Sequence, residues 1–336
     1  MKNMQKTHEN VLVTGGGGFL GRAVVEKLLQ RKDRVISISR KFYTDLQRIG
    51  AEQIQADIRD KNTLEKSFQG VQTVFHIAAK ADIWGKKADF FATNVTGTKN
   101  VISACTKNKV KILVYTSSPS VVFNGKDMAG VDESIPYADH FNAFYPETKA
   151  IAEKMVRSAA SENLRVIILR PHLIWGPGDN HLVPGIIKKA KSLKRIGSGE
   201  NLVDTIYIDN AADAHILARD ALKRNPDLSG NVYFISQGRP VKLWSMVDDI
   251  LDAAGLDPVS GSVSSRTAWL AGFFFELFYR ILRIDKEPPM TRFVAEELAT
   301  SHWFDISGAK KDLGYFPLVS TEKGLEKLKD RLGIKK

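Results

Sequence analysis

The sequence has very little cysteine and no long apolar run. Cys105 is the only cysteine among 336 residues, which excludes an internal disulfide framework and is typical of a reducing compartment. The first ten residues are polar, so we expect no signal peptide there. In the apolar segment 268–284 the uninterrupted run is eight residues long and ends at Glu276, too short to span a bilayer. We therefore expect a cytoplasmic protein that touches a membrane surface at most.

Several functional signatures are missing as well. There is no Gly-x-Ser-x-Gly elbow of a hydrolase, and the histidines are not at metal-ligand spacing, so no metal site is expected. The net charge of +11 would suit an anionic substrate or membrane, but no nucleic-acid fold signature accompanies it. We therefore expect no nucleic-acid partner, and we interpret most of the excess charge as solvated side chains on helix faces.

The first half of the chain alternates short β-branched runs with longer amphipathic stretches, in which apolar residues recur at a helical period. Strands are predicted at 11–15, 34–40, 52–58, 73–79, 111–118 and 165–171, and helices at 19–31, 62–68, 89–106 and 146–161. This rhythm predicts the α/β class, with a Rossmann-type doubly wound parallel sheet and crossover helices.

After Pro171 the pattern loosens. The predictions there are a loop at 172–180, a helix at 184–193, strands at 204–208 and 232–236 with a helix from Ala211 between them, and helical or irregular structure beyond. We predict an NADP-binding Rossmann domain over 1–175, to which the elements around 203–236 return. A smaller C-terminal substrate-binding domain, partly interleaved with the first, is predicted over 176–336.

A glycine-rich turn lies between the first predicted strand and its helix. Gly15, Gly18 and Gly21 stand at three-residue spacing, a variant of the dinucleotide-binding fingerprint. Residues without Cβ allow a tight turn that brings backbone N–H groups and a helix N-terminus against phosphate. A plain glycine-rich loop is the alternative, but the strand before it and the amphipathic helix after it favour the dinucleotide.

The residues after the second strand bear on which dinucleotide binds. A carboxylate there would bond the ribose hydroxyls of NAD, whereas this chain has Ser39, Arg40 and Lys41. Two cations suit a 2′-phosphate, so NADP(H) is favoured and NAD(H) is the alternative; Arg40 could also merely stack on adenine or face solvent. Asp57, after the third strand, is a candidate contact for the adenine amino group.

The pair Tyr145 and Lys149 offers a proton donor with a cation one helical turn away. Pro146 favours a helix start at this point, so both side chains lie on one side of that helix. A phenol titrates near pH 10 unaided, and a neighbouring ammonium is expected to lower that pKa. Tyr145 is then a candidate general acid, and Lys149 a candidate contact for the nicotinamide ribose.

A hydroxyl at the end of the fifth strand completes the predicted site. Ser118 lies at the carboxyl edge, where open α/β sheets bind ligands, and could hold a substrate oxygen beside Tyr145. Ser117 is the alternative. Asn94, inside a predicted helix, is either a surface residue or a brace for the strand beside the site. Each residue alone has a plain structural reading, but together they predict proton and hydride exchange on a carbonyl or an alcohol.

These motifs resemble the extended short-chain dehydrogenase/reductase superfamily over essentially the whole length. Within it, Tyr-Thr-Ser-Ser-Pro-Ser-Val-Val (115–122) and Tyr-Pro-Glu-Thr-Lys (145–149) are similar to the 3β-hydroxysteroid and sterol-4α-carboxylate dehydrogenase branch. Segments 76–85, 170–182, 201–212 and 290–293 resemble more closely the 2-alkyl-3-oxoalkanoate reductases of bacterial long-chain olefin biosynthesis. Arg170-Pro171 also sits where the superfamily carries this pair.

The resemblance implies NADPH-dependent reduction of a β-keto acid with two long alkyl arms to the 3-hydroxy acid. Tyr145 would protonate the oxygen, Ser118 would hold it and Lys149 would tune Tyr145. The predicted cofactor contacts are Gly15, Gly18, Phe19, Leu20, Arg40, Asp57, Ile58, Ala78, Ala79, Lys80, Asn94, Thr116, Tyr145, Lys149 and Pro171. The predicted partner is a long-chain or sterol-like carboxylate, and a homodimer or a complex with enzymes of the same pathway stays open.

Three other activities are weighed against this one. A 3β-hydroxysteroid or sterol-4α-carboxylate 3-dehydrogenase is the nearest rival, because a sterol acid would suit the same features. Sugar dehydratases of the superfamily carry acidic residues after the strand-five hydroxyl, where this chain has Pro119 and Ser120, so a nucleotide-sugar enzyme is disfavoured. A non-enzymatic dinucleotide sensor would typically lack the Tyr145–Lys149 pair.

Segment 268–284 has two interpretations. It is either a helix that lines an apolar substrate pocket or packs on the core, which we favour, or a helix on a membrane surface with its aromatic residues inserted and Arg280 and Arg283 at the headgroups.

Overall fold

A seven-stranded parallel sheet forms the centre of the computed structural model, which describes residues 9–333. Its order is β12-β7-β5-β4-β1-β2-β3. The strands are β1 (Asn10–Thr14), β2 (Arg34–Ser39), β3 (Glu52–Gln55), β4 (Thr73–His76), β5 (Ile112–Thr116), β7 (Arg165–Pro171) and β12 (Val232–Ile235). The Rossmann-type fold predicted from the strand–helix rhythm is confirmed. The signal-peptide prediction falls mostly on residues 1–8, outside the described part of the chain.

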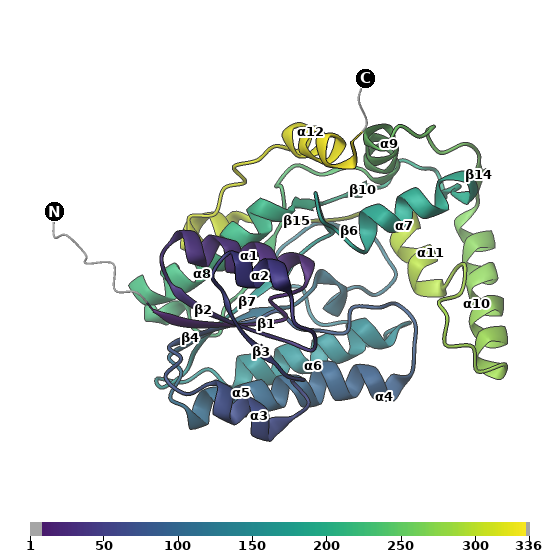
Figure 1. The fold of residues 1–336 in the computed structure, drawn as a ribbon. Coiled ribbons are helices and arrows are strands. Elements are labelled where there is room, and N and C mark those ends of the chain that lie inside the picture. The colour runs from purple at the N-terminus through teal and green to yellow at the C-terminus, as the bar shows by residue number, and fades with distance from the viewer. Residues whose placement is uncertain (1–8, 334–336) are drawn as a thin grey trace.

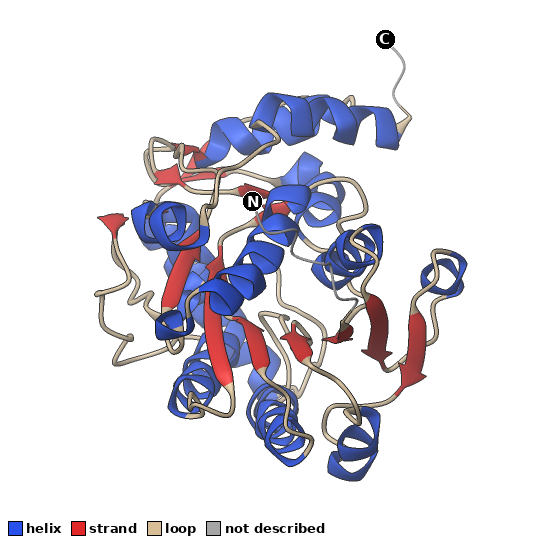
Figure 2. Cartoon of the chain, turned by 90° about the vertical axis from the view of Figure 1, so that its left-hand side faces the viewer, coloured by secondary structure: helices blue, strands red, loops and turns tan. Residues whose placement is uncertain are grey.

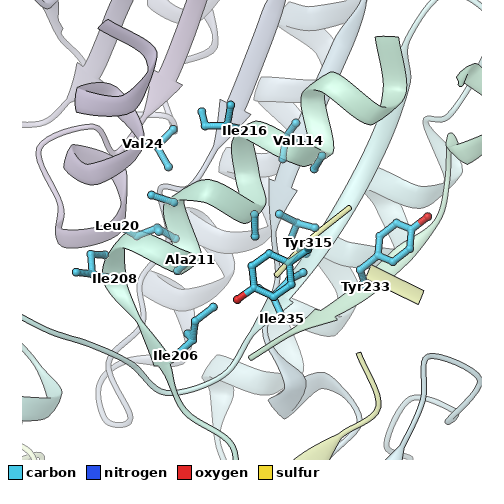
Figure 3. Packing of buried hydrophobic residues seen from close by; sticks show 14 of the residues in the cluster. Leu20, Val24, Val114, Ile206, Ile208, Ala211, Ile216, Tyr233, Ile235 and Tyr315 are labelled. Carbon is cyan, nitrogen blue, oxygen red and sulfur yellow. The ribbon is translucent and has the colours of Figure 1, made fainter. Parts of the chain in front are cut away.

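Helices cover both faces of this sheet because its strands are apolar on both sides (Figures 1 and 2). Val11 and Val13 belong to a core with α1 (Phe19–Gln30) and α8 (Ile208–Arg224), and Figure 3 shows part of that core. Leu12 between them points to the other face and packs in a core with α3 (Lys61–Ser67), α5 (Gly97–Lys107) and α6 (Phe144–Ser158).

The strand order reverses between β1 and β4. From β1 the chain crosses through α1 to β2 on one side, whereas β4 and β5 extend the sheet on the other side. Ligands of open α/β sheets bind at such a switch point, outside the carboxyl ends of the strands. The predicted site residues should therefore meet where β1 and β4 end.

A second, four-stranded sheet was not predicted. Its order is β13 (Val241–Lys242), β10 (Leu202–Val203), β15 (His302–Phe304) and β6 (Met128–Val131). The prediction of helical and irregular structure beyond 236 is thus wrong at β13, at β15 and at β14 (Ser262–Val263), which pairs with β9 (Arg195–Ile196). Pairs of two or three residues leave almost no period in the sequence, so only tertiary pairing identifies them as strands.

Two further predictions need correction. The single helix at 89–106 is α4 (Lys87–Phe90), a π-helical stretch at Phe91–Thr96 and then α5. The loop predicted at 172–180 contains β8 (Ile174–Trp175), which pairs with β11 (Ile206–Tyr207). The remaining α-helices are α2 (Thr44–Arg48), α7 (Leu182–Lys189), α9 (Leu243–Ala253), α10 (Ser265–Ile281), α11 (Arg292–Ala299) and α12 (Thr321–Leu332).

Helix α10 lies at the edge of the molecule and packs on α11 (Figure 1). One side of α10 packs on the core through Ala268, as the favoured prediction had it, whereas many of the large apolar side chains of the helix are exposed and do not pack inward. Within residues 9–333, no helix is both long enough and apolar enough to cross a membrane.

Candidate active site

The glycine turn lies where β1 ends, against the end of β4. Gly15 has a φ of +74°, and a Cβ there would lie 2.9 Å from Ala78 Cα. At Gly21 a Cβ would lie 2.1 Å from the Gly15 carbonyl oxygen. Gly15 is therefore required for its positive φ and its close contact with Ala78. Gly21 is required because helix α1 packs directly against the turn.

The N-terminus of α1 is open beside this turn. Gly18 caps the helix without any side-chain hydrogen bond, so the first N–H groups of α1 keep their capacity for an anion. Ser39 Oγ at the end of β2 accepts a hydrogen bond from Gly17 N at 3.0 Å and holds the turn in place. This turn is open because its glycines have no side chains, and no side chain caps the helix beside it. Such an arrangement fits a dinucleotide pyrophosphate.

Cations gather at the ends of β2 and β3. Arg40 and Lys41 are exposed, and the charge of Arg40 contributes to a lowered pKa of Asp57. The main cause of that lowering is Arg59, whose guanidinium donates hydrogen bonds to both Asp57 carboxylate oxygens. Arg59 was not singled out from the sequence, since it lies in a turn with no motif. Its charge is balanced by that of Asp57 in an ion pair at this edge.

The other predicted cofactor contacts share the carboxyl edge of the sheet. Their positions are the first turn of α1 (Phe19 and Leu20), the segment after β3 (Ile58), the segment after β4 (Ala78, Ala79 and Lys80), the last residue of β5 (Thr116) and the last residue of β7 (Pro171). The sheet therefore brings together residues that are far apart in the sequence. Their roles in binding remain predictions.

Asn94 is buried in the π-helical stretch and braces the segment after β4. Its Oδ1 accepts from Lys80 N at 2.7 Å, and its Nδ2 donates to Lys80 O at 3.0 Å and to Thr148 Oγ1 at 3.0 Å. Of the two sequence interpretations, the surface residue is wrong and the brace is right. The π-helical turn, a feature frequent at functional sites, is what places this amide between β4 and α6.

Ser117 and Ser118 point to different surroundings. The Ser117 hydroxyl donates to the carboxylate of Glu153, which is fully buried under the sheet edge. Ser118 is half-buried, its Oγ lies 2.9 Å from Ser120 Oγ, and its side chain interacts with Tyr145 and lowers the pKa of the phenol. The geometry therefore favours Ser118 over Ser117 as the partner of Tyr145.

Tyr145 is the second residue of α6, and its side chain interacts with Ser118. Although part of its side chain stays accessible, burial raises the pKa of the phenol; the hydrogen bond with Ser118 opposes this, and the charge of Glu297 adds to it. The lowered pKa expected from Lys149 is thus not found in this structure. A raised pKa keeps the phenol protonated at neutral pH, which is the form a general acid needs.

Lys149 is buried behind Tyr145 and is held by other groups. Its ammonium donates to Tyr115 Oη at 2.7 Å and to the Thr116 carbonyl oxygen at 2.5 Å. Burial lowers the pKa of Lys149 to about 7, with Glu153 acting in the opposite direction. Tyr115, whose side chain sequence reasoning did not select, therefore positions this lysine.

A buried ion pair links the elements that carry the candidate site residues. Arg170 on β7 bonds Glu153 on α6 through Nη2 at 2.6 Å, and Tyr137 Oη donates to the same carboxylate at 2.9 Å. Arg170 also lies over the Phe234 ring at 5.2 Å. Because Glu153 also accepts a hydrogen bond from the Ser117 hydroxyl, the pair connects β7, α6 and the end of β5.

A cluster near Tyr145 escaped the sequence reasoning. Candidate ligand atoms of His172, Glu297 and His302 lie within 4.8 Å of one another. His172 Nε2 and His302 Nδ1 already share a hydrogen bond of 2.6 Å, and His302 Nε2 bonds the Glu297 carbonyl oxygen at 2.8 Å. The cluster is therefore a hydrogen-bonded chain. Its spacing gave no signal because β15 brings His302 to His172 across 130 residues.

Proteins similar in sequence extend over almost the whole chain. The 3-beta hydroxysteroid dehydrogenase/isomerase family matches residues 12–263. The 2-alkyl-3-oxoalkanoate reductase of Shewanella oneidensis is 44% identical over 333 residues, covering 96% of this chain and 86% of its own. A decarboxylating sterol-4-alpha-carboxylate 3-dehydrogenase of Mus musculus is 34% identical over 324 residues, covering 94% of this chain and 88% of its own.

Solved structures share the fold. MoeE5 in complex with UDP-glucuronic acid and NAD has a TM-score of 0.73 at 23% identity, covering 96% of this chain and 98% of its own. UDP-glucose 4-epimerase of Thermotoga maritima has a TM-score of 0.75 at 22% identity, with the same coverage. At such identities the likeness extends to the fold alone. The sequence relatives are oxidoreductases acting on CH–OH or C=O groups, and with them this chain belongs to the 3-beta hydroxysteroid dehydrogenase/isomerase family of extended short-chain dehydrogenases/reductases.

Proposed function

We propose that the protein reduces the ketone of a long-chain 2-alkyl-3-oxoalkanoic acid to the 3-hydroxy acid with NADPH. The observation that carries this proposal is the placement of Tyr145, near the start of α6, beside Ser118 at the carboxyl edge of the sheet. The 44% identity to a 2-alkyl-3-oxoalkanoate reductase over nearly the whole chain supports this substrate class.

In the proposed mechanism the open turn at Gly15 and Gly21 and the N-terminus of α1 hold the pyrophosphate. NADPH, when bound there, supplies the hydride. Ser118 and Tyr145 hold the ketone oxygen between their hydroxyls. As negative charge develops on that oxygen, Tyr145 transfers its phenolic proton to it and later regains a proton from solvent.

Lys149 acts behind this pair. Its ammonium stabilises negative charge on Tyr145 while the phenolic proton is away, and Tyr115 and the Thr116 carbonyl fix its position. Because burial brings the pKa of Lys149 to about 7, proton release from this residue would weaken catalysis at alkaline pH.

A 3β-hydroxysteroid or sterol-4α-carboxylate 3-dehydrogenase is the second candidate, favoured by the family match and by the sterol-acting relatives. A 2-alkyl-3-oxo acid and a sterol-4α-carboxylate share a C3 oxygen and a carboxylate on the adjacent carbon, and a 3β-hydroxysteroid shares the C3 oxygen, so the same Tyr145 chemistry would serve all three. The alkyl-chain substrate is preferred because its named relative is 44% identical, against 34% for the sterol enzyme.

A substrate panel separates the candidates. Initial rates are followed at the NADPH absorbance band with a long-chain 2-alkyl-3-oxo acid and with a 3-ketosteroid, and in reverse with the corresponding alcohols. We expect kcat/KM for the alkyl substrate to exceed that for the steroid by about 100-fold or more, since the difference in fit is worth several kcal/mol. Turnover of the steroid alone would overturn the choice of substrate while leaving the reaction type intact.

The cofactor prediction rests on Arg40 and its neighbours. Substituting Arg40→Ala should lower kcat/KM for NADPH by about 10- to 100-fold while changing NADH little, because a charge-assisted bond to the 2′-phosphate is worth about 1.5–3 kcal/mol. Lys66→Ala, which removes an exposed cation on α3, is the matched control. Equal losses with both cofactors, or a preference of the wild type for NADH, would contradict the assignment of NADP(H).

A further inference from the structure

Helix α10 carries an apolar face that the proposed reaction does not use. Phe274 is 63% exposed, Phe278 54% and Ile281 69%. We define the α10 outer face as these three residues together with Leu270, Phe273 and Leu277, all of which are exposed. Their spacing of three, four, seven and eight residues places them along one side of the helix. An exposed stripe of large apolar residues at the edge of a molecule marks an interaction surface.

The packing of α10 prevents these side chains from turning inward. The buried side of the helix is a narrow stripe of Ala268, Gly272 and Glu276, spaced one turn apart. At Gly272 a Cβ would lie 2.6 Å from the Thr291 carbonyl carbon, so the helix is pressed against the start of α11. Glu276 is satisfied there by Arg292, which donates from its backbone N at 2.7 Å and from Nη2 at 2.8 Å.

Positive charge surrounds the outer face. Arg266 and Arg280 on α10 are exposed, and in the segment just after it the exposed Arg283 and Lys286 stand beside Asp285 and Glu287, which pair with Lys86 and Lys189. The only carboxylate of α10 is the buried Glu276, so its solvent-facing surface carries no negative charge. An apolar stripe bordered by arginines is the pattern of a helix that lies in a lipid interface, whereas a docking face for another globular protein would not need this surplus of cations.

We propose that the α10 outer face docks onto an anionic lipid surface, with α10 lying in the plane of the interface. Its phenylalanines enter the headgroup boundary, and Arg266, Arg280 and Arg283 contact lipid phosphates. A helix of this kind binds reversibly, through the sum of buried apolar area and attraction to anionic headgroups.

The same contacts would place the active site near the lipid. Trp84, on the segment that follows β4 and Lys80, donates from Nε1 to the Ile284 carbonyl at 3.1 Å and lies under Arg280 at 5.6 Å. On the other side, Trp269 of α10 and Asn142, three residues before Tyr145, both bond the Glu296 carboxylate. The contacts through Glu296 and Asn142 would thus connect the lipid-facing helix α10 to the segment just before Tyr145. This closeness suits an alkyl substrate, and this second part rests on the proposed function.

Vesicle sedimentation tests the docking without cofactor or substrate. The wild type is mixed with vesicles of phosphatidylglycerol and phosphatidylcholine, or of phosphatidylcholine alone. We expect at least about 10-fold stronger binding to the anionic vesicles, weakened by salt. The double variant Phe274→Ser/Phe278→Ser should lose about 10-fold or more in affinity, and the milder Phe274→Ser serves if the double variant does not fold. Leu318→Ser removes another exposed apolar side chain, far from α10 in the sequence, and should bind the vesicles as the wild type does.

Three outcomes overturn the proposal. They are absence of wild-type binding to anionic vesicles at low salt, equal binding by the Phe274→Ser/Phe278→Ser variant, and conversion of a wild-type dimer to a monomer by that variant with no change in vesicle binding. The last, read by light scattering, would assign the face to a second copy of the chain. Because the assay contains no substrate, a wrong substrate assignment would leave its result unaffected.

Discussion

The Tyr145→Phe variant is expected to bind NADPH like the wild type and to lose about 10²- to 10⁴-fold in kcat, the range for removal of a positioned general acid. The phenylalanine keeps the ring near the start of α6 and removes only the hydroxyl that interacts with Ser118. The proton for the developing alkoxide must then come from water. Single-turnover rates with saturating NADPH measure the loss, and cofactor fluorescence measures binding.

The pH profile gives a second readout of the same residue. Lys149, with a pKa of about 7, sets the first alkaline loss of activity in the wild type, and the raised pKa of Tyr145 places a second, Tyr145-dependent limb at higher pH. In Tyr145→Phe this limb should vanish. Tyr233→Phe is the matched control, because its hydroxyl bonds Asp312 at 2.8 Å, away from the site. A Tyr145→Phe enzyme with wild-type kcat would refute the role of Tyr145.

Arg170→Met is expected to destabilise the fold by about 3–5 kcal/mol, the cost of leaving a buried charge without its partner. Arg170 and Glu153 have almost no exposed surface, and the methionine would fill the volume without neutralising the carboxylate. The midpoint of guanidinium denaturation, followed by circular dichroism, measures this change. Glu153→Met combined with Arg170→Met should recover part of the loss, because a pair of apolar side chains leaves no unpaired buried charge.

Arg34→Met supplies the comparison. Arg34 forms a two-pronged bond with Glu52 at 2.6 and 2.9 Å, but both side chains are half exposed or more. Water screens such a pair, so its loss should cost about 1 kcal/mol or less. If Arg170→Met is no more destabilising than Arg34→Met, the buried pair does not hold β7 and α6 together as described.

The Arg170–Glu153 pair also affects two of the residues proposed to be catalytic. Glu153 accepts the hydroxyl of Ser117, the neighbour of Ser118, and its charge favours the protonated form of Lys149. A perturbed Glu153 should therefore change both the placement of Ser118 and the protonation of Lys149. The active-site residues depend in this way on an ion pair with no catalytic role of its own.

Much of the site was predictable because its signals are local in sequence. The glycine turn is specified by residues 15–21, and Pro146 fixes the helix start at Tyr145. The strand–helix rhythm then determines that the sheet is parallel, and parallel strands bring their carboxyl ends to one edge. This is why Ser118 and Asp57, which follow strands, were predicted to lie at that edge, whereas Asn94, inside a helix, was left open between a surface residue and a brace.

The sequence by itself therefore determined the main elements of the candidate site: a doubly wound sheet, a glycine turn after the first strand, and a tyrosine predicted to lie near a strand-end serine. Tertiary structure decided which group holds Lys149, that burial sets the Tyr145 pKa, that His302 meets His172, and that the apolar side of α10 faces outward. Each of these depends on contacts between segments far apart in the chain or on the packing of a whole helix. A periodic pattern reports which face of a helix is apolar, but only packing decides whether that face meets the core or solvent.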